Sequence, residues 1–366
     1  MKKIYYITAV FATLFLVGCG DGIDLPGVNV ETDLNKIPLP DNNVNLEQVE
    51  LKPSTEPMLH EGLHTEEDFQ RIRDKKAAGE EPWVSAYQLL VESQFSQKTA
   101  DTYPTEWIKR GVSGDENYMN AARGATIAYQ QALRWKIEQD DEYAAKAVEN
   151  LNKWVQTCVG VTGNTNLSLA AGLYGYEFAI AGELLRDYEG WDRADFAAFQ
   201  NWLLKVFYPA NDDFLKRHHD TNALHYWANW CLCNIAAKMA IGIVTDRRDI
   251  YNEGIDHLQT GDTNGRLRRA IYHDYAPDYN FAQWQESGRD QGHTLMCVGL
   301  MGVICQLAWS QGDDFFAYDD NLFMRACEYA ACCNYTNETV PYTTYIWQKQ
   351  SQWGYPIPEE QTTLGG

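Results

Sequence analysis

The sequence has few basic residues, with 30 Lys and Arg against 51 Asp and Glu, so its net charge is −21. This excess of negative charge repels nucleic acid, and we exclude nucleic acid as a partner. A polyanionic sugar remains compatible with the charge if the binding cleft itself is locally positive. Six of the eight histidines lie between residues 218 and 293, together with several arginines, and that region is where such a surface is expected.

Three further features are missing, and each excludes a class of structure. Apart from Cys19, the cysteines show neither a Cys-X-X-Cys pair nor a zinc-like spacing, so we predict no metal site, no cofactor and mostly buried free thiols. No segment alternates polar and apolar residues over any length, as a strand does. No fixed-period repeat is present, which argues against helical solenoids of the tetratricopeptide type.

The N-terminus has the pattern of a secretion signal. Met1-Lys2-Lys3 is a positive start, residues 4–17 are apolar, and Leu16-Val17-Gly18-Cys19 resembles the cleavage site of a bacterial lipoprotein. The apolar run is short for a transmembrane helix. We therefore expect residues 1–19 to be a signal peptide and Cys19 to carry the lipid that anchors the protein to a membrane. This predicts a lipid-anchored protein in the periplasm or on the outer-membrane surface.

Residues 20–58 are rich in Asp, Asn, Pro and Gly, and we expect them to form a flexible linker. Segments with the 3.6-residue apolar period of a helix then follow one another, starting after a predicted capping box at Thr65 and Asp68. They cover residues 83–93, 117–139, 142–157, 167–188, 194–207, 225–244, 250–258, 291–310 and 322–334. Antiparallel helix pairs on this scale can close into an (α/α) toroid, so we predict an all-α domain over residues 59–366 with a central cleft.

The last expected helix, residues 322–334, has no apolar periodic segment after it to pair with. An unpaired helix would leave apolar surface in water, at about 25 cal/mol per Å². We therefore expect an incomplete barrel in a chain that is truncated at its C-terminus. The alternative is that residues 336–366 fold back and cover this helix.

A polar stripe precedes the apolar segment 295–309. Glu286, Arg289, Asp290 and His293 are three and four residues apart, so they share one face if the helix begins near Glu286. Functional sites hold such groups at the start of a buried helix more often than cores do. The alternative is a helix cap in which a carboxylate pairs with an arginine, but a cap does not account for His293 and Gln291.

A second polar group precedes the apolar segment 231–243. Asn222, His225 and Asn229 are three and four residues apart, and Tyr226 and Trp230 form an aromatic pair beside them. A single buried histidine would usually be structural. Two helix starts that each carry a histidine and an amide or guanidinium partner favour one shared site.

The run Glu286-Ser-Gly-Arg-Asp-Gln-Gly-His-Thr294 resembles the alginate lyase superfamily of polysaccharide lyases. Cys305-Gln-Leu-Ala-Trp-Ser-Gln-Gly312, Leu63-His-Thr-Glu-Glu-Asp-Phe69 and Tyr174-Gly-Tyr-Glu-Phe178 fit the same family. The resemblance implies an (α/α) toroid and metal-independent β-elimination on a uronate polysaccharide, either alginate or a glucuronan-like polymer. The chain departs from the family pattern at two positions: its histidine is displaced by one residue to His225, and Met296 stands where relatives have a tyrosine.

Elimination requires three roles. The uronate carboxylate must be neutralised, for which Asn229, Arg289 and Asn222 are candidates. A base must remove the C5 proton, and His225 or His293 suits this role, whereas a tyrosine such as Tyr279 would protonate the leaving oxygen. The remaining residues that we expect to contact the substrate are Tyr174, Tyr226, Trp227, Trp230, Glu286 and Gln291.

Two other functions fit parts of the sequence. An (α/α) glycoside hydrolase would use two carboxylates, such as Glu286 with Asp220 or Asp278. A non-catalytic lipoprotein would capture an anionic glycan through its aromatic side chains.

Overall fold

The computed structural model describes residues 48–336, 339–351 and 353–366. The predicted signal peptide, Cys19 and most of the predicted linker lie outside these residues. Residues 49–58 belong to the folded part, because Val49 hydrogen-bonds Gln259, Lys52 accepts from Asn252, and Met58 is buried. The capping box at Thr65 and Asp68 forms as predicted and begins the first described helix.

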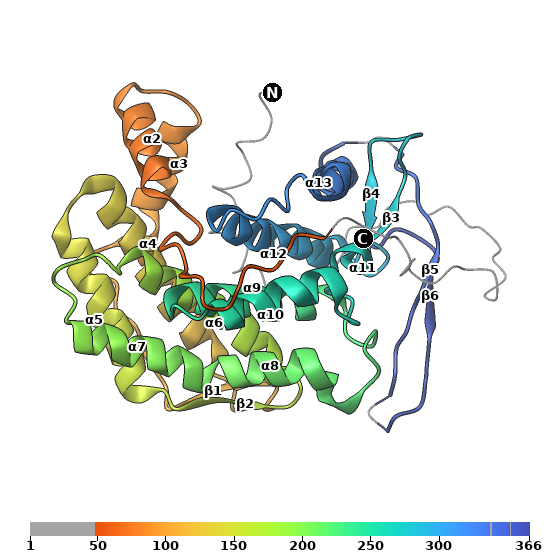
Figure 1. The fold of residues 1–366 in the computed structure, drawn as a ribbon, viewed down its shortest axis with the longest axis horizontal. Helices are drawn as coiled ribbons and strands as arrows, with labels where there is room; N and C mark the ends of the chain where they lie inside the picture. Colours follow the sequence, from red (N-terminus) through yellow and green to blue (C-terminus); the bar gives the residue numbers. More distant parts are fainter. Residues whose placement is uncertain (1–47, 337–338, 352) are drawn as a thin grey trace.

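The fold is mainly helical and is built around a row of buried helices, each packed on the next (Figure 1). The buried helices are α4 (Tyr118–Glu138), α6 (Leu167–Leu184), α9 (Ala228–Val244) and α12 (Gln291–Ser310). The helices that cover them are α5 (Asp141–Thr157), α7 (Arg193–Val206), α8 (Tyr208–Arg217), α10 (Arg248–Thr260) and α13 (Tyr318–Tyr335). Short helices α2 (Glu66–Ala77), α3 (Trp83–Glu92) and α11 (Leu267–Ala270) complete the set.

Helices α6 and α9 lie at the centre, and almost every side chain of both is buried. They approach closely because α6 has Gly172 at the contact: a Cβ atom built there would lie 2.4 Å from Cys233 Sγ and 2.9 Å from the main chain of Cys233. Helix α12 is long and apolar enough to cross a membrane by length and composition, and it packs between α9 and α13. The inner row is thus apolar on most sides because other helices surround it.

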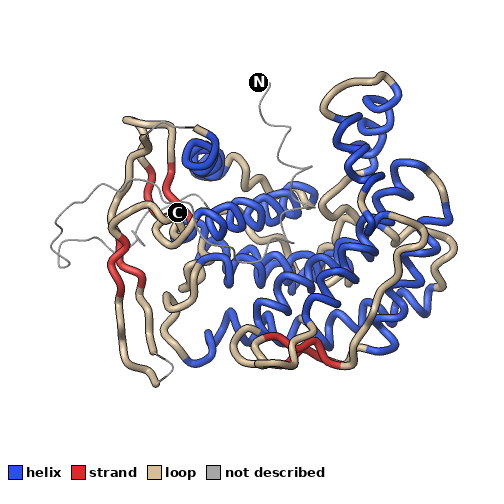
Figure 2. The backbone as a smooth tube through the Cα atoms, turned by 180° about the vertical axis from the view of Figure 1, so that it is seen from behind, coloured by secondary structure: helices blue, strands red, loops and turns tan. Residues whose placement is uncertain are grey.

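Short strands correct the all-α prediction. They form three two-stranded sheets: β1 (Trp107–Arg110) with β2 (Gly160–Gly163), β3 (Ile271–Asp274) with β4 (Ala282–Trp284), and β5 (Tyr345–Trp347) with β6 (Glu359–Gln361). Each is three or four residues long, too short to show an alternating pattern. Figure 2 shows the strands at the edges of the helical body.

The segment after α13 folds back across the molecule. Tyr329 of α13 donates to the carbonyl of Pro341, and the Gly366 carbonyl accepts from the main chain of Gln291 at 3.2 Å. Figure 1 accordingly shows the C-terminus beside the start of α12. This segment therefore reaches the end of the helix row where the two predicted polar groups lie.

Glycine-to-alanine substitutions at Gly172 and Gly302 should change the stability of the fold in opposite directions, because only Gly172 lies at a close helix contact. Gly172→Ala forces a methyl group into Cys233, so it should destabilise the fold by about 1–3 kcal/mol. Gly302→Ala in α12 is the matched control, because its nearest neighbour is Phe323 at 3.9 Å and alanine favours a helix by about 1 kcal/mol. Thermal unfolding measures both variants. A Gly172→Ala protein as stable as wild type would contradict the close approach.

Candidate active site

Helix α9 begins at Ala228, three residues later than predicted, so His225 lies in the turn that precedes the helix. The His225 N–H donates to the carbonyl of Asn222 at 3.1 Å, which closes that turn. Trp227 occupies the N-cap position and provides no side-chain cap. The first backbone N–H groups of α9 therefore need acceptors from elsewhere in the fold.

Those acceptors come from the segment before α12. The main chain of Ala228 donates to Gln285 Oε1 at 3.0 Å, and that of Asn229 donates to Glu286 Oε1 at 3.1 Å. A negative charge at a helix N-terminus is also favoured by the helix dipole. The start of α9 is thus capped by side chains that lie 57 positions away in the sequence.

The start of α12 at Gln291 agrees with the predicted helix 291–310, so the condition for one shared helical face, a helix start near Glu286, is not met. Asp290 is the N-cap of α12 and accepts from the His293 N–H at 2.7 Å, so the helix starts at Gln291. The preceding residues form a turn in which the Arg289 N–H donates to the Glu286 carbonyl at 2.8 Å. The turn and the cap still bring the side chains of Glu286, Arg289, Asp290 and His293 together, although these four side chains do not lie along one face of a helix.

Glu286 lies at the centre of this group and is fully buried. Its Oε2 faces Arg289 Nη1 at 3.3 Å, while Oε1 holds the Asn229 N–H. Burial raises the pKa of the Glu286 carboxyl, and the nearby Arg289 guanidinium is the largest influence against that rise. Glu286 therefore orients Arg289 and Asn229, and it does not present a carboxylate to a ligand.

The side-chain amide of Asn229 is poorly satisfied by hydrogen bonds within the described residues. Its Oδ1 is buried without a hydrogen-bond partner among the described residues, and its Nδ2 meets only Met296 Sδ, at 3.6 Å. A buried polar atom without a partner costs free energy, and a bound ligand can supply the missing bond. Met296 stands where the resembling family has a tyrosine, so the thioether occupies that space here.

A stack of rings connects Arg289 with His225. The Arg289 guanidinium lies 5.3 Å from the centre of the Trp227 ring, which stacks on Trp347 at 4.3 Å. The ring of Trp347 in turn lies parallel to that of His225 at 6.2 Å. Two residues separated by 64 positions are therefore brought to the same corner of the molecule, with two indoles between them.

The two histidines have different partners. His293 Nδ1 lies 2.6 Å from Asp290 Oδ2, and the same oxygen lies 3.7 Å from Arg289 Nε. Hydrogen bonds from His293 help to hold the pKa of Asp290 below its usual value despite partial burial, so this carboxylate stays ionised. His225 Nδ1 instead accepts a main-chain N–H from Gln350, at 2.8 Å.

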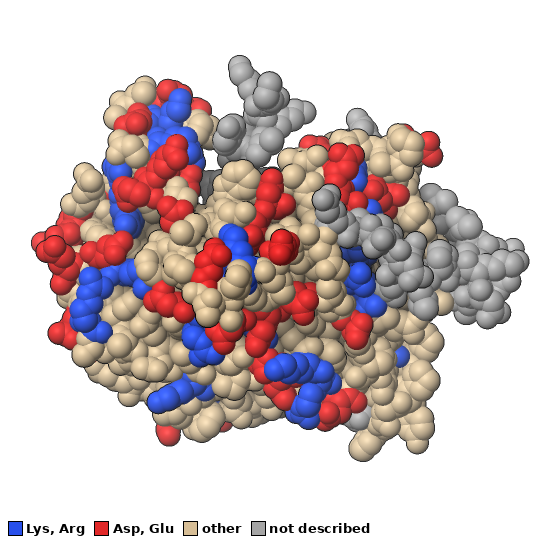
Figure 3. Space-filling model, in the orientation of Figure 1, with Lys and Arg blue, Asp and Glu red and all other residues tan. Residues whose placement is uncertain are grey.

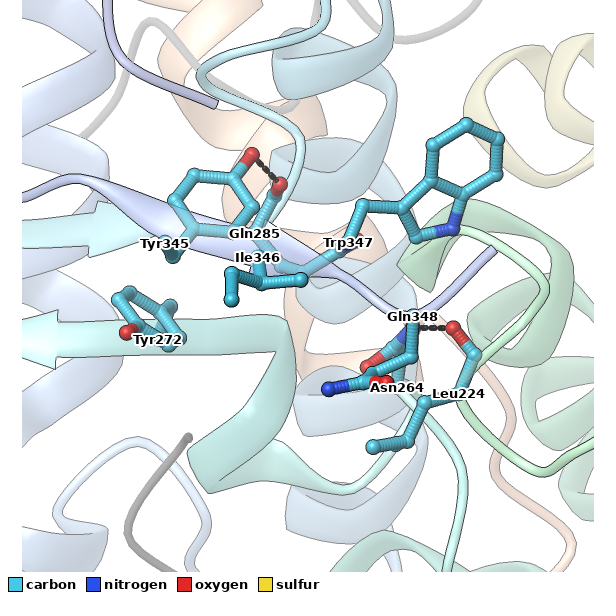
Figure 4. Close-up of a pocket in the computed structure, with 8 residues that line it drawn as sticks. All are labelled: Leu224, Asn264, Tyr272, Gln285, Tyr345, Ile346, Trp347 and Gln348. Carbon is cyan, nitrogen blue, oxygen red and sulfur yellow. Dashed lines mark hydrogen bonds between the residues drawn. The ribbon is translucent and has the colours of Figure 1, made fainter. Parts of the chain in front are cut away.

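The starts of α9 and α12 form two sides of this corner, and the segment around β5 forms the third. The sequence reasoning missed this third side. Its residues Tyr345 to Gln348 line a small pocket of about 10 Å³, shown in Figure 4, with Tyr345 donating to the Gln285 carbonyl. Leu224 also lines this pocket, at the position where the family pattern has a histidine. Alternating aromatic residues at 345 and 347 are the signal that could have indicated a strand.

Other predicted contact residues are held by protein neighbours. Asn222 donates to the Gln348 carbonyl, and the Gln291 side chain donates to the Gly365 carbonyl. Tyr226 packs between Trp230 and Phe214. These groups shape the corner, and their polar atoms or ring faces are already engaged.

Two predicted tyrosines lie apart from this corner. The hydroxyl of Tyr174, within α6, accepts from Arg110, whose guanidinium lies over Tyr118, the first residue of α4. Tyr279 is 54% exposed in the loop between β3 and β4, and its ring contact is with Tyr275. Among the described residues, no hydrogen bond or ring contact joins Tyr279 to His225, Arg289 or His293.

The charges and ligand types define what the corner can bind. On the face shown in Figure 3, Lys and Arg lie scattered among Asp and Glu and form no basic patch. Within residues 48–336, 339–351 and 353–366, no three His, Cys, Asp or Glu side chains gather closely enough to hold a metal ion. An anion would therefore find its positive partners locally, at Arg289 and the residues beside it.

Solved structures with a similar fold are alginate lyases. A histidine-to-alanine variant of alginate lyase A1-III complexed with a tetrasaccharide has a TM-score of 0.57 and 14% identity, covering 75% of this chain and 79% of that one. The A1-III enzyme from Sphingomonas species A1 has a TM-score of 0.53 and 14% identity, with coverages of 76% and 80%. An alginate lyase from Bacteroides ovatus has a TM-score of 0.50 and 14% identity, with coverages of 73% and 81%.

No curated protein sequence matches this chain. A family model described as alginate lyase matches residues 72–338. The helical fold, the cation-bearing corner and this match define a polysaccharide lyase. The chain belongs to the alginate lyase family, as its Glu286–Thr294 motif implied.

Replacing Arg289 tests whether this corner is the active site. Arg289→Ala should lower kcat on the order of 10²-fold or more and leave the fold intact, because a site cation is lost while Glu286 still accepts the Asn229 N–H and caps α9. Arg217→Ala is the matched control, since Arg217 is half-exposed and pairs with Asp213 on the surface. Activity that falls only in step with melting temperature would make Arg289 a structural residue.

The same variant has a pH signature. The folded pKa of Glu286 is raised above its unfolded value, so stability from this group is full below the unfolded pKa and is lost as pH rises through the folded pKa. Arg289→Ala removes the main charge that opposes the rise. Melting temperature should therefore fall more steeply in this variant than in wild type as pH rises above the ordinary pKa of a glutamate.

Proposed function

We propose that this lyase cleaves a uronate-containing polysaccharide, alginate or a glucuronan-like polymer, by β-elimination at the start of α12. The observation that carries the proposal is one oxygen, Asp290 Oδ2, which lies beside both Arg289 and His293. A carboxylate-binding cation and an imidazole are thereby held side by side. The tetrasaccharide bound by alginate lyase A1-III in a similar fold supports a polysaccharide chain as the ligand.

Arg289 and Asn229 are suited to the substrate carboxylate. Neutralising that group makes the C5 proton more acidic and stabilises the enolate that forms when the proton leaves. The guanidinium is held by Glu286 and Trp227, and the Asn229 Nδ2, whose contact is the Met296 thioether at 3.6 Å, can donate to a carboxylate. Groups held in this way need little rearrangement in the transition state.

His293 is suited to the base. Its Nδ1–H donates to the Asp290 carboxylate, so Nε2 of the neutral ring carries the lone pair. Nε2 takes the C5 proton, the electrons of that bond form the C4–C5 double bond, and the C4–O4 bond breaks. The resulting imidazolium, stabilised by Asp290, returns the proton to O4 when both groups leave from the same face of the sugar.

The geometry gives no support to the hydrolase alternative. Hydrolysis needs two carboxylates on either side of the bond that is cleaved. Glu286 is fully buried against Arg289, whereas Asp220 is exposed and pairs with Arg217, and Asp278 lies in an exposed loop. Family membership likewise favours an enzyme over a non-catalytic glycan binder.

Two broader proposals complete the description. The row α4, α6, α9 and α12 with its outer helices is proposed to be an incomplete (α/α) toroid, with the reacting corner at its N-terminal ends. The lipobox-like sequence at Cys19 supports a lipid-anchored protein in the periplasm or on the outer-membrane surface, where a polysaccharide from the surroundings would be met.

The function is tested by the product. Incubation with alginate or glucuronan should yield an unsaturated uronate that absorbs in the ultraviolet, whereas hydrolysis would yield no such absorbance. Asp290→Asn should lower kcat on the order of 10²-fold or more, because an amide no longer fixes the His293 tautomer or stabilises its cation.

Asparagine caps a helix as well as aspartate does, so the melting temperature of Asp290→Asn should stay close to wild type. Asp192→Asn, at the N-cap of α7, is the matched control for a carboxylate cap outside the site. Saturated products with every uronate polymer would refute elimination, and full activity in Asp290→Asn would remove His293 from the role of base.

A further inference from the structure

We infer that His225 and Lys349 form a second carboxylate subsite, for a uronate that neighbours the reacting one, and that His225 serves it as an Nε2–H donor. The inference rests on the proposed function, because it takes a polyuronate as the ligand. It assigns His225 a part in binding and removes it as a candidate for the base.

The tautomer of His225 follows from one hydrogen bond. The main-chain N–H of Gln350 lies 2.8 Å from His225 Nδ1, and a backbone amide nitrogen can only donate. Nδ1 must then carry the lone pair, so the proton of the neutral ring is on Nε2. His293 has the opposite arrangement, since its Nδ1 faces a carboxylate.

The segment that donates this bond also fixes the ring in place. Trp347 Nε1 donates to the His225 carbonyl at 2.7 Å and its ring stacks on the imidazole. On the other side, Asn222 donates to Gln350 and to the carbonyl of Gln348. Both ends of the turn that carries His225 are therefore tied to the same segment, residues 347–350.

The exposed nitrogen of His225 is open to a ligand. Among the described residues, Nε2 has no hydrogen-bond partner, and it is not one of the fully buried polar atoms. Partial burial and the nearby Lys349 ammonium both lower the pKa of His225, so the ring stays neutral at pH 7. Tyr226 flanks the ring edge-on at 4.8 Å and brings no charge at this pH.

The position of His225 points to a neighbouring sugar and not to the reacting one. Trp227 and Trp347 lie between it and Arg289, so one carboxylate group cannot touch both. Lys349 lies over Trp347 at 5.1 Å and pairs with Glu359 Oε1 at 2.5 Å on the surface. Its ammonium is close enough to His225 to influence the charge of the imidazole. Regularly spaced carboxylates along a polyuronate match two anion positions that are separated by ring faces.

Three substitutions separate the donor from the base. Glutamine places an N–H near the position of Nε2, whereas asparagine reaches only as far as Nδ1, and alanine reaches neither. His225→Ala and His225→Asn should raise KM for a long polyuronate roughly 10-fold and keep kcat within about 3-fold, as expected for loss of a hydrogen bond to a charged group. His225→Gln should recover most of that loss. A base would instead lose kcat in all three variants.

The tautomer is measured without any turnover. Two-bond ¹H–¹⁵N correlation spectra of the wild-type protein, with His225→Gln to assign the signals, should show a neutral His225 with its proton on Nε2. Titration with a uronate tetrasaccharide should shift that signal, while the uncharged sugar of equal length should not. A proton on Nδ1, or no shift on saturation with the uronate, would overturn the inference, and neither result depends on whether the polymer is cleaved.

Discussion

The fold of the active corner depends on one buried carboxylate. Glu286 accepts a main-chain N–H at the start of α9 and faces Arg289 before α12, so a single side chain fixes two helix ends and a cation. A buried charge is tolerated only when it is paired and hydrogen-bonded. This requirement keeps Asn229 and Arg289 at a constant separation, which suits them to hold one substrate carboxylate from two sides.

The segment around β5 adds a wall that neither helix provides. Its Trp347 stacks between Trp227 and His225, and its main chain sets the tautomer of that histidine. Two imidazoles in one corner thus acquire opposite hydrogen-bonding abilities from their partners, a carboxylate for His293 and a backbone amide for His225. The proposed roles of His293 as the base and of His225 as a binding donor follow from this difference in hydrogen-bond partners.

Much of this could be predicted from the sequence, because helical periodicity is a local property. The segment 291–310 was predicted with the bounds that α12 has, and both polar groups lie at one corner. The start of α9 could not be predicted, since acceptors on Gln285 and Glu286, each 57 positions away, cap it at Ala228. Contacts between residues 222–225 and 347–350 were also missed, because they join segments more than 120 positions apart through single hydrogen bonds.

The central claim is that a uronate reacts between Arg289 and His293. It is tested most directly by the crystal structure of the Asp290→Asn protein with a uronate tetrasaccharide bound. The account predicts one sugar with its carboxylate on Arg289 and Asn229 and its C5 hydrogen toward His293 Nε2, with a neighbouring carboxylate on His225. A sugar chain bound at the Arg110 and Tyr174 end of the helix row, or with C5 facing away from His293, would contradict it.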